Sequence, residues 1–310
     1  MIHRSSYPFA CLLLRSHYFD FFDSPIFGVN VVSERVTSLQ VWVNDCRFIG
    51  LASSSDGGAI YYSSSDIKMV VEQCLFKNCD AGSRGGCIHF SSSGKSGIVL
   101  SKCYASKCKS SQSTSQQSGS FAYISVNEKS RNELLWVSYS QCASSTYNNP
   151  EQTLSVSDGL VLYANDNISN NLAYQVSGMK LDGLDEGSII KFSNIAHNNA
   201  TNYYCLTFYS SSIVFKNINF INNTEGQPTS SYYGIIFCQS SSIIRFEDSV
   251  FIHNDYRENA FLFRRTTGYA GLAVINCWLP QVFNQTLAGI VNHRGQTETH
   301  NISFFNTFAE

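Results

Sequence analysis

The chain reads GGAIYYSSS from Gly57 to Ser65, and the phrase returns as GGCIHFSSS from Gly85 to Ser93. Weaker copies are YCLTFYSSS, which ends at Ser212, and GIIFCQSSS, which ends at Ser242. Each serine triplet is followed by a run of residues that ends in an aromatic anchor. Because the phrase recurs and contains no reactive group, it predicts a structural module that is used several times.

The anchors return at a nearly constant spacing, which lies in the range of solenoid repeats. They are Phe48, Phe76 and Tyr104 in one part of the chain, and Ile195, Phe220 and Phe251 in another. The runs alternate apolar and polar residues and are rich in β-branched and aromatic side chains, as strands are. Gly-Gly and Ser-Ser-Ser within each period exclude a helical repeat. The pattern therefore predicts a solenoid of short strands.

A parallel β-helix fits this pattern, with coils stacked about 4.8 Å apart. We expect about nine coils over residues 36–278, and caps at residues 1–35 and 279–310, because terminal repeats are atypical. The expected internal columns are Phe48, Phe76 and Tyr104, and Cys46, Cys74 and Cys103. The pairs Gly57–Gly58 and Gly85–Gly86 should form tight bends. Asn223 and Asn254, which end F-x-x-N phrases, should stack as an amide ladder.

The composition limits the classes of partner. The 310 residues include 21 basic and 23 acidic residues, so no broad field favours nucleic acid. No run of 18 apolar residues predicts a membrane-spanning helix, and the short apolar run from Pro8 to Leu14 is a poor signal peptide. No cofactor motif is present. The low charge content nevertheless favours a β-rich extracellular or cell-surface protein.

The phrases carry a resemblance to a known family. GGAI at Gly57, GGCI at Gly85, and F-x-x-N at Phe220 and Phe251 resemble the repeats of polymorphic outer-membrane proteins of chlamydiae and of trichomonad surface proteins. The resemblance covers most of the chain, with good motifs in four coils. It implies a right-handed parallel β-helix of the pectin lyase-like superfold and a role in adhesion. The chain has no recognisable membrane anchor or autotransporter barrel, which leaves its surface attachment open.

The 11 cysteines have three interpretations. Cys74, Cys79, Cys103 and Cys108 form two C-x4-C pairs at the same register. Stacked thiols suit a buried column, and this interpretation is favoured over disulfides and over a metal site. We therefore expect no metal ligands.

An enzyme is the main alternative, because the superfold implied by the resemblance also contains polysaccharide lyases and hydrolases. The acidic candidates are Asp182, Asp185 and Glu186, which suggest a solvated turn, and Glu247 and Asp248, which suggest outward strand positions. They do not recur at one register, as a catalytic groove would require. His197 and His253 are expected at corners. No catalytic residue is predicted.

Tyrosine pairs are the better indication of function. In each pair one ring should point outward if the strand alternates. The candidate binding residues are Tyr61, Tyr62, Tyr203, Tyr204, Tyr232 and Tyr233. The sequence thus predicts a non-enzymatic recognition or adhesion module that binds a host or cell-surface protein or glycan, with a carbohydrate-active enzyme and a structural spacer from a longer protein as alternatives.

Overall fold

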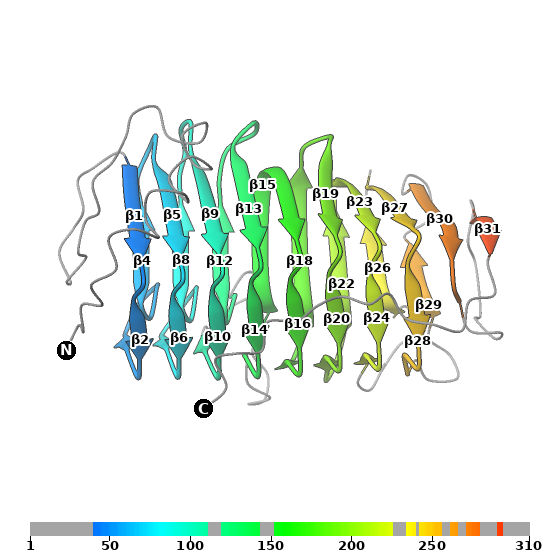
Figure 1. Ribbon diagram of the computed structural model, residues 1–310, viewed down its shortest axis with the longest axis horizontal. Helices are drawn as coiled ribbons and strands as arrows, with labels where there is room; N and C mark the ends of the chain where they lie inside the picture. Colours follow the sequence, from blue (N-terminus) through cyan, green and yellow to red (C-terminus); the bar gives the residue numbers. More distant parts are fainter. Residues whose placement is uncertain are drawn as a thin grey trace, which may run out of the picture.

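Successive copies of the repeat lie on top of one another as parallel strands. The computed structural model describes residues 40–110, 119–142, 152–225, 234–239, 242–255, 261–265, 271–279 and 290–293. Within these ranges the regular elements are strands, and their pairings are parallel. Figure 1 shows the coils side by side from β1 (Gln40–Asn44) to β31 (Ile290–His293). The predicted all-β parallel β-helix is confirmed.

The strands form ladders, to which each coil contributes in turn. The first ladder contains β1, β5 (Lys68–Glu72), β9 (Gly97–Ser101), β13 (Arg131–Leu135), part of β15 (Gln152–Ala164), β19 (Ser188–Lys191), β23 (Ser212–Lys216), β27 (Ile243–Glu247), β30 (Gly271–Cys277) and β31. The second contains β2 (Arg47–Ile49), β6 (Leu75–Lys77), β10 (Tyr104–Ser106), β14 (Ser138–Ser140), β16 (Asn167–Ser169), β20 (Asn194–Ala196), β24 (Asn219–Ile221) and β28 (Val250–Ile252).

Two further sets of strands complete the coils. Short strands form the third set, which is β3 (Ala52–Ser53), β7 (Asp80–Ala81), β11 (Lys109–Ser110), β17 (Leu172–Ala173), β21 (Asn199–Ala200) and β25 (Thr224–Glu225). The fourth ladder contains β4 (Ile60–Ser63), β8 (Ile88–Ser91), β12 (Ala122–Ser125), the rest of β15, β18 (Val176–Leu184), β22 (Tyr204–Tyr209), β26 (Gly234–Gln239) and β29 (Phe261–Arg265). Because β15 belongs to both the first and fourth ladders, these join into a 17-stranded sheet.

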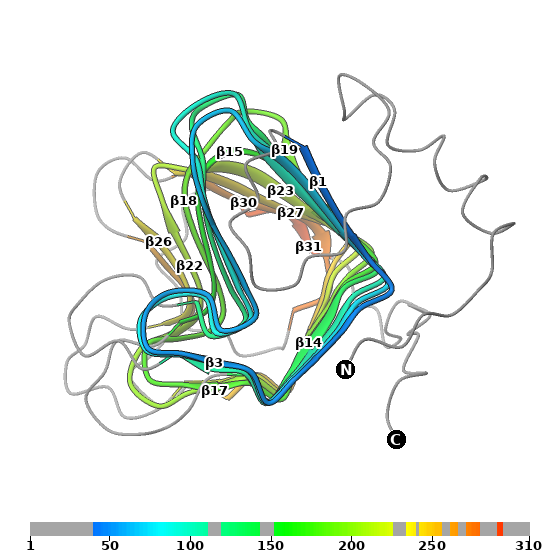
Figure 2. The ribbon, with the colours of Figure 1, turned by 90° about the vertical axis from the view of Figure 1, so that its left-hand side faces the viewer.

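The coils wind in a right-handed sense. Seen from the end where β1 lies, each coil runs clockwise from the first ladder to the fourth as the coils recede from the viewer (Figure 2). The second ladder has eight strands, so about seven turns separate its ends, fewer than the nine coils expected. One coil is longer than the expected period, because Tyr139 pairs with Ala105.

The anchor column is present, with one predicted member misplaced. Phe48 pairs with Phe76, and their rings stack with centroids 4.9 Å apart. Ala105, not Tyr104, pairs with Phe76, while Tyr104 pairs with Leu75. The prediction for Tyr104 was wrong because this coil is slightly longer than the coil before it, and a single step along a strand reverses the side chain. The column continues through Tyr139, Ile168, Ile195, Phe220 and Phe251.

The predicted cysteine column is confirmed at the corner between the first and second ladders. The backbone N–H of Leu75 donates to the Cys46 carbonyl, and that of Tyr104 donates to the Cys74 carbonyl, each at 2.9 Å. Cys103 follows Cys74 in the next coil, and its thiol is buried. The three thiols lie in single file along the axis, where they behave as small apolar side chains.

The predicted asparagine ladder is also confirmed. The side-chain amide of Asn171 donates to Asn198 Oδ1 at 2.9 Å, Asn198 donates to Asn223 at 3.0 Å, and Asn223 donates to Asn254 at 3.1 Å. A left-handed residue precedes each ladder position, such as His197 with φ 56°. Asn and His tolerate this conformation better than most residues. His197 and His253 thus occupy corners, as expected.

The Gly-Gly bends precede the fourth ladder, as predicted. Gly57 has φ 68° and Gly85 has φ 67°, which is the left-handed region that glycine adopts most easily. The second glycine of each pair allows close approach of neighbouring coils. A Cβ on Gly58 would lie 2.2 Å from the Gly86 carbonyl oxygen, and a Cβ on Gly86 would lie 2.1 Å from that of Ser120.

The predicted caps lie at the limits of the described residues. Residues 1–35 fall outside the described ranges. Within residues 279–310, β31 pairs with β30 and continues the first ladder. No helix in the described ranges is long and apolar enough to cross a membrane.

Candidate functional site

The fourth ladder carries the predicted tyrosines of the first coil, and one of them lies on its outer face. Strand β4 alternates, so Tyr61 points outward and is 58% exposed. Tyr62 points inward and packs against the core beside Phe90. The expectation that one ring of an adjacent pair faces outward is therefore confirmed for this pair.

Tyr61 is the end member of a three-ring column. It pairs with His89, and His89 pairs with Tyr123 in the next coil. Both ring contacts are stacked, with centroids 5.1 Å apart. His89 is only 3% exposed, although its side chain faces away from the core. The column is thus an ordered aromatic ladder whose accessible ring is Tyr61.

Two residues from neighbouring bends cover His89 and Tyr123. The Arg84 backbone N–H donates to Asp56 Oδ1 at 2.9 Å, and Asp56 Oδ2 lies 3.6 Å from His89 Nδ1. The Arg84 guanidinium lies 5.2 Å from the centre of the Tyr123 ring, within cation–π range. Burial lowers the pKa of His89 to about 4, although the Asp56 carboxylate opposes this shift. The imidazole is therefore neutral at pH 7, which suits a stacked ring.

A column of hydroxyl groups runs beside the aromatic ladder. It lies two residues further along each strand than the aromatic rings. Its members, which the strand pairings of the fourth ladder align, are Ser63, Ser91, Ser125 and Ser157. Ser63 is exposed, and Ser91 and Ser125 are half-buried. The accessible surface thus combines a flat ring with adjacent hydroxyl groups from successive coils.

The later tyrosines form a separate cluster. Tyr204 stacks on Phe237 with ring centroids 4.4 Å apart, and Tyr203 contacts Tyr174 at 6.1 Å. The residue aligned with Tyr61 in this coil is Thr207, not a tyrosine. The structure therefore does not bring the predicted tyrosines into one stripe. Tyr232 and Tyr233 lie outside the described residues.

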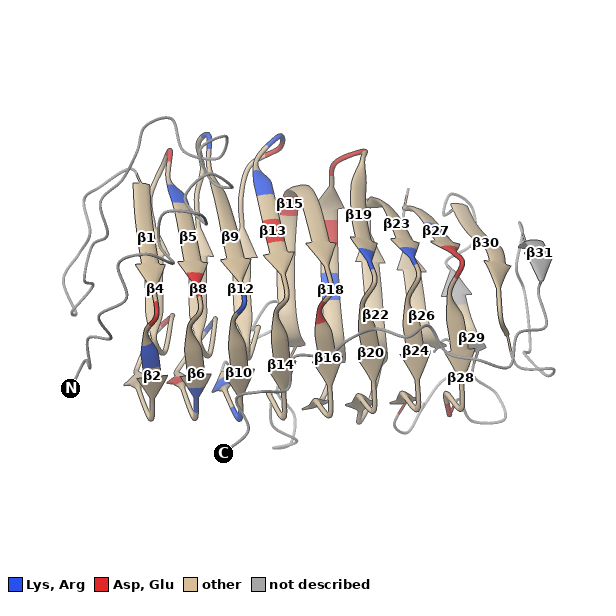
Figure 3. Cartoon of the chain, in the orientation of Figure 1, with Lys and Arg blue, Asp and Glu red and all other residues tan. Residues whose placement is uncertain are grey.

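Acidic side chains gather on the middle coils. In Figure 3 acidic positions lie on the neighbouring strands β13, β15 and β18. Burial raises the pKa of Asp158, and the charges of Asp182, Glu128 and Asp185 raise it further. Burial also raises the pKa of Asp182, against the attraction of Lys180. Asp182 is a half-buried residue of β18, so its expected place in a solvated turn was wrong.

The remaining acidic candidates differ from Asp182. Glu186 is exposed, and the Asp185 carboxylate accepts the backbone N–H of Lys129 at 2.6 Å. These two residues follow β18, as a turn requires.

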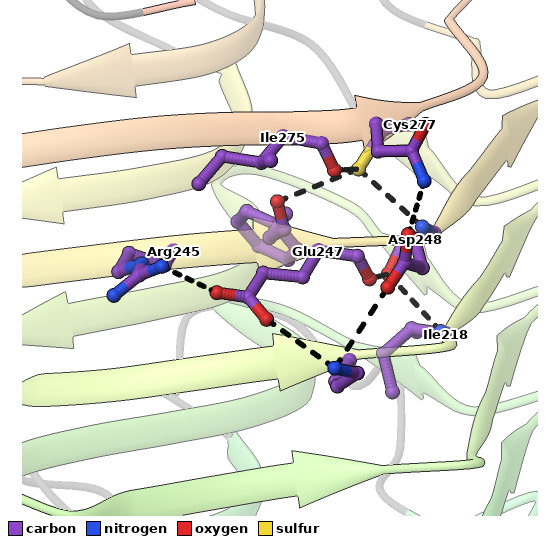
Figure 4. Close-up of polar contacts among 10 residues, drawn as sticks. Ile218, Arg245, Glu247, Asp248, Ile275 and Cys277 are labelled. Carbon is purple, nitrogen blue, oxygen red and sulfur yellow. Dashed lines mark hydrogen bonds and ion pairs between the residues drawn. The ribbon is translucent and has the colours of Figure 1, made fainter. Parts of the chain in front are cut away.

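The acidic pair at the end of β27 takes part in ion pairs across the coils (Figure 4). Lys216 Nζ lies 3.7 Å from Glu247 and 3.9 Å from Asp248, and Arg245 donates to Glu247 at 2.6 Å. Asn276 also donates to Asp248. These partners are basic and amide side chains of the same and adjacent coils, so the pair stabilises coil stacking.

A further feature is a cluster of thiols inside the β-helix. Cys79, Cys87 and Cys108 have sulfur atoms that all lie within 4.8 Å of one another, and all three are buried. The sequence placed Cys79 and Cys108 at one register, but Cys87 was not expected beside them. The signal that could have found it is the difference between GGAI and GGCI, which puts a thiol directly before β8.

Comparison with known proteins gives no match. No family model matches the chain, and no curated protein or solved structure matches it either.

Proposed function

We propose that the chain is a non-enzymatic recognition module that binds carbohydrate on the outer face of the fourth ladder. The observation that supports this is the aromatic ladder that ends in the exposed ring of Tyr61. Its two inner rings are buried and stacked on each other, with Asp56 and Arg84 beside them, so the face is ordered before a ligand arrives. Preorganisation of this kind lowers the entropic cost of binding.

The chemistry of the face favours a sugar over an apolar peptide. A sugar ring has an apolar C–H face that can stack on Tyr61, and hydroxyl edges that can pair with serine hydroxyl groups. Ser63 and Ser91 lie beside the ring and offer both donors and acceptors. The ligand would therefore lie along the axis and contact successive coils, as ligands of repeat proteins do.

Glycan-array binding of the purified chain tests this proposal. Tyr61→Ala should reduce binding to any glycan that the native chain retains by about fivefold or more, because a stacking contact is worth roughly 1 kcal/mol or more and each 1.4 kcal/mol is about a tenfold change in affinity. Tyr104→Ala is the matched control, since Tyr104 is half-buried on the second ladder. Equal losses for both variants, or unchanged binding for Tyr61→Ala, would refute the proposed site. Absence of any binding by the folded chain would favour the structural spacer.

A carbohydrate-active enzyme is the second candidate, favoured by Asp158 and Asp182. Both carboxyl groups have a raised pKa because of burial, and raised carboxyl pKa values are typical of general acids. Incubation with polysaccharides, followed by reducing-end and unsaturated-product assays, would detect hydrolysis or lyase activity. Activity that Asp182→Asn abolishes while glycan binding persists would support this candidate.

The resemblance to polymorphic outer-membrane-protein repeats supports a location outside the cell. We extend the proposal to an extracellular or cell-surface module with a host or cell-surface ligand. Cell fractionation with surface biotinylation of the tagged native protein tests this location. Recovery confined to the cytosol would remove the adhesion role.

A further inference from the structure

A cluster of three thiols faces inward from two opposite walls of the second and third coils. Cys79 and Cys108 follow the second-ladder strands β6 and β10, in the column that the asparagine ladder continues. Cys87 comes from the other wall, where its backbone pairs with Ala59 and Phe121. Two stacked thiols and one opposing thiol make a triangle, whereas Cys46, Cys74 and Cys103 make a single file.

The Gly-Gly bend is what brings Cys87 into the triangle. The loop between Cys79 and Cys87 contains GSRGG at residues 82–86. Gly85 takes a left-handed conformation, and a Cβ on Gly86 would lie 2.4 Å from the carbonyl oxygen of Lys109, the residue after Cys108. A side chain at Gly86 would therefore push the strand away from Cys108. The equivalent of Cys87 in the first coil is Ala59, and in the third coil it is Phe121.

We infer that Cys79, Cys87 and Cys108 form a zinc site in the reduced protein. Zinc–thiolate bonds of about 2.3 Å place the sulfur atoms of a tetrahedral site about 3.8 Å apart. The observed separations are within 4.8 Å, so small side-chain movements would complete the triangle. Each thiol is 0% exposed, which suits a closed structural site.

Zinc fits this site better than other soft ions. Thiolates favour zinc and copper(I), and divalent zinc leaves one negative charge fewer than copper(I) in a core where charge is costly. Zinc prefers four ligands. Cys142 is the next thiol of the same column, because Ser140 pairs with Ser106 and each cysteine follows two residues later, and it is the candidate for the fourth position. The site therefore holds three defined ligands and one candidate on the following coil.

Zinc analysis of the full-length chain tests the inference. The chain is reduced, incubated with zinc sulfate, desalted and analysed by plasma mass spectrometry. The native chain should retain about one zinc per chain. Cys87→Ala should lower zinc affinity at least about 100-fold and should fold, because alanine occupies the equivalent position of the first coil. Cys103→Ala, at an equally buried cysteine of the single-file column, should retain the metal.

Two further readouts make the result decisive. Cadmium should give a sulfur-to-metal absorption band in the native chain and in Cys103→Ala but not in Cys87→Ala. Zinc should raise the melting temperature of the same two proteins only, because a ligand stabilises the state that binds it. A folded native chain without zinc, equal retention by Cys87→Ala, or loss in Cys103→Ala overturns the inference. So does peptide mapping that finds Cys87 in a disulfide in the reduced, zinc-treated chain.

Discussion

Replacement of Asn198 by alanine should destabilise the middle coils by about 4 kcal/mol, which is the sum of two lost buried partnerships. The side-chain amide of Asn198 donates to Ile168 O at 2.9 Å and to Asn223 Oδ1 at 3.0 Å. Its Oδ1 accepts the backbone and side-chain N–H groups of Asn171 at 3.2 and 2.9 Å. The variant leaves the Ile168 carbonyl and the Asn171 backbone N–H without these partners inside the protein. A buried polar group that loses its partner costs about 1–3 kcal/mol.

The assay is urea unfolding followed by circular dichroism, together with hydrogen exchange of backbone amides. Exchange is needed because repeat proteins can unfold in parts, which complicates a single free energy of unfolding. The amide of Asn171 should exchange faster in the variant. The matched control is Asn199→Ala in protein made without glycosylation, since Asn199 is exposed and its loss should change stability by less than about 0.5 kcal/mol. Equal effects of the two substitutions would refute the ladder argument.

Three further predictions test the bends, the register and the aromatic ladder. Gly86→Ala should lower the free energy of unfolding in urea by about 1–3 kcal/mol, because the new Cβ would lie 2.1 Å from a backbone oxygen. Gly271→Ala is the control and should leave it unchanged, because its Cβ would lie 3.9 Å from the nearest atoms. Ala105→Phe should destabilise the protein by a similar amount, because Ala105 is the buried residue that pairs with Phe76. Tyr104→Phe should change the free energy of unfolding by less than about 0.5 kcal/mol. The reverse order of the two effects would contradict the register of Ala105 with Phe76. His89 has a pKa of about 4 in the folded protein, below the unfolded value of about 6.5. The free energy of unfolding should therefore fall by up to about 3 kcal/mol as the pH drops from about 6.5 to about 4. His89→Gln should remove this part of the pH dependence of unfolding.

Much of the fold was predictable because a β-helix repeats its local rules in every coil. Glycine pairs, alternating runs and corner asparagines are short-range signals, and each predicts the same position in successive coils. The position of Tyr104 was not predictable from a constant period, because a coil can gain one residue in a bend without changing its strands. Only the pairing with the next coil decides which side chain enters the core.

The candidate site was less predictable for the same reason. Tyr61 could be assigned to the surface from alternation, but its stacking on His89 depends on pairing between coils. Asp182 and Asp158 are distant in the sequence and come together only where β15 and β18 pair. Cys87 meets Cys79 and Cys108 across the interior, which no period along the chain describes.

Every column and ladder of this protein depends on the register between neighbouring coils, and zero-length cross-linking reports on that register. A carbodiimide joins a carboxylate and a lysine amine only when they are in contact. Lys109 Nζ lies 3.0 Å from Asp80, and Lys216 Nζ lies 3.7 Å from Glu247. Mass spectrometry of the digested protein should find both of these amide links, each between neighbouring coils. Their absence, with the same lysines joined instead to carboxylates several coils away, would contradict the stacking of the coils.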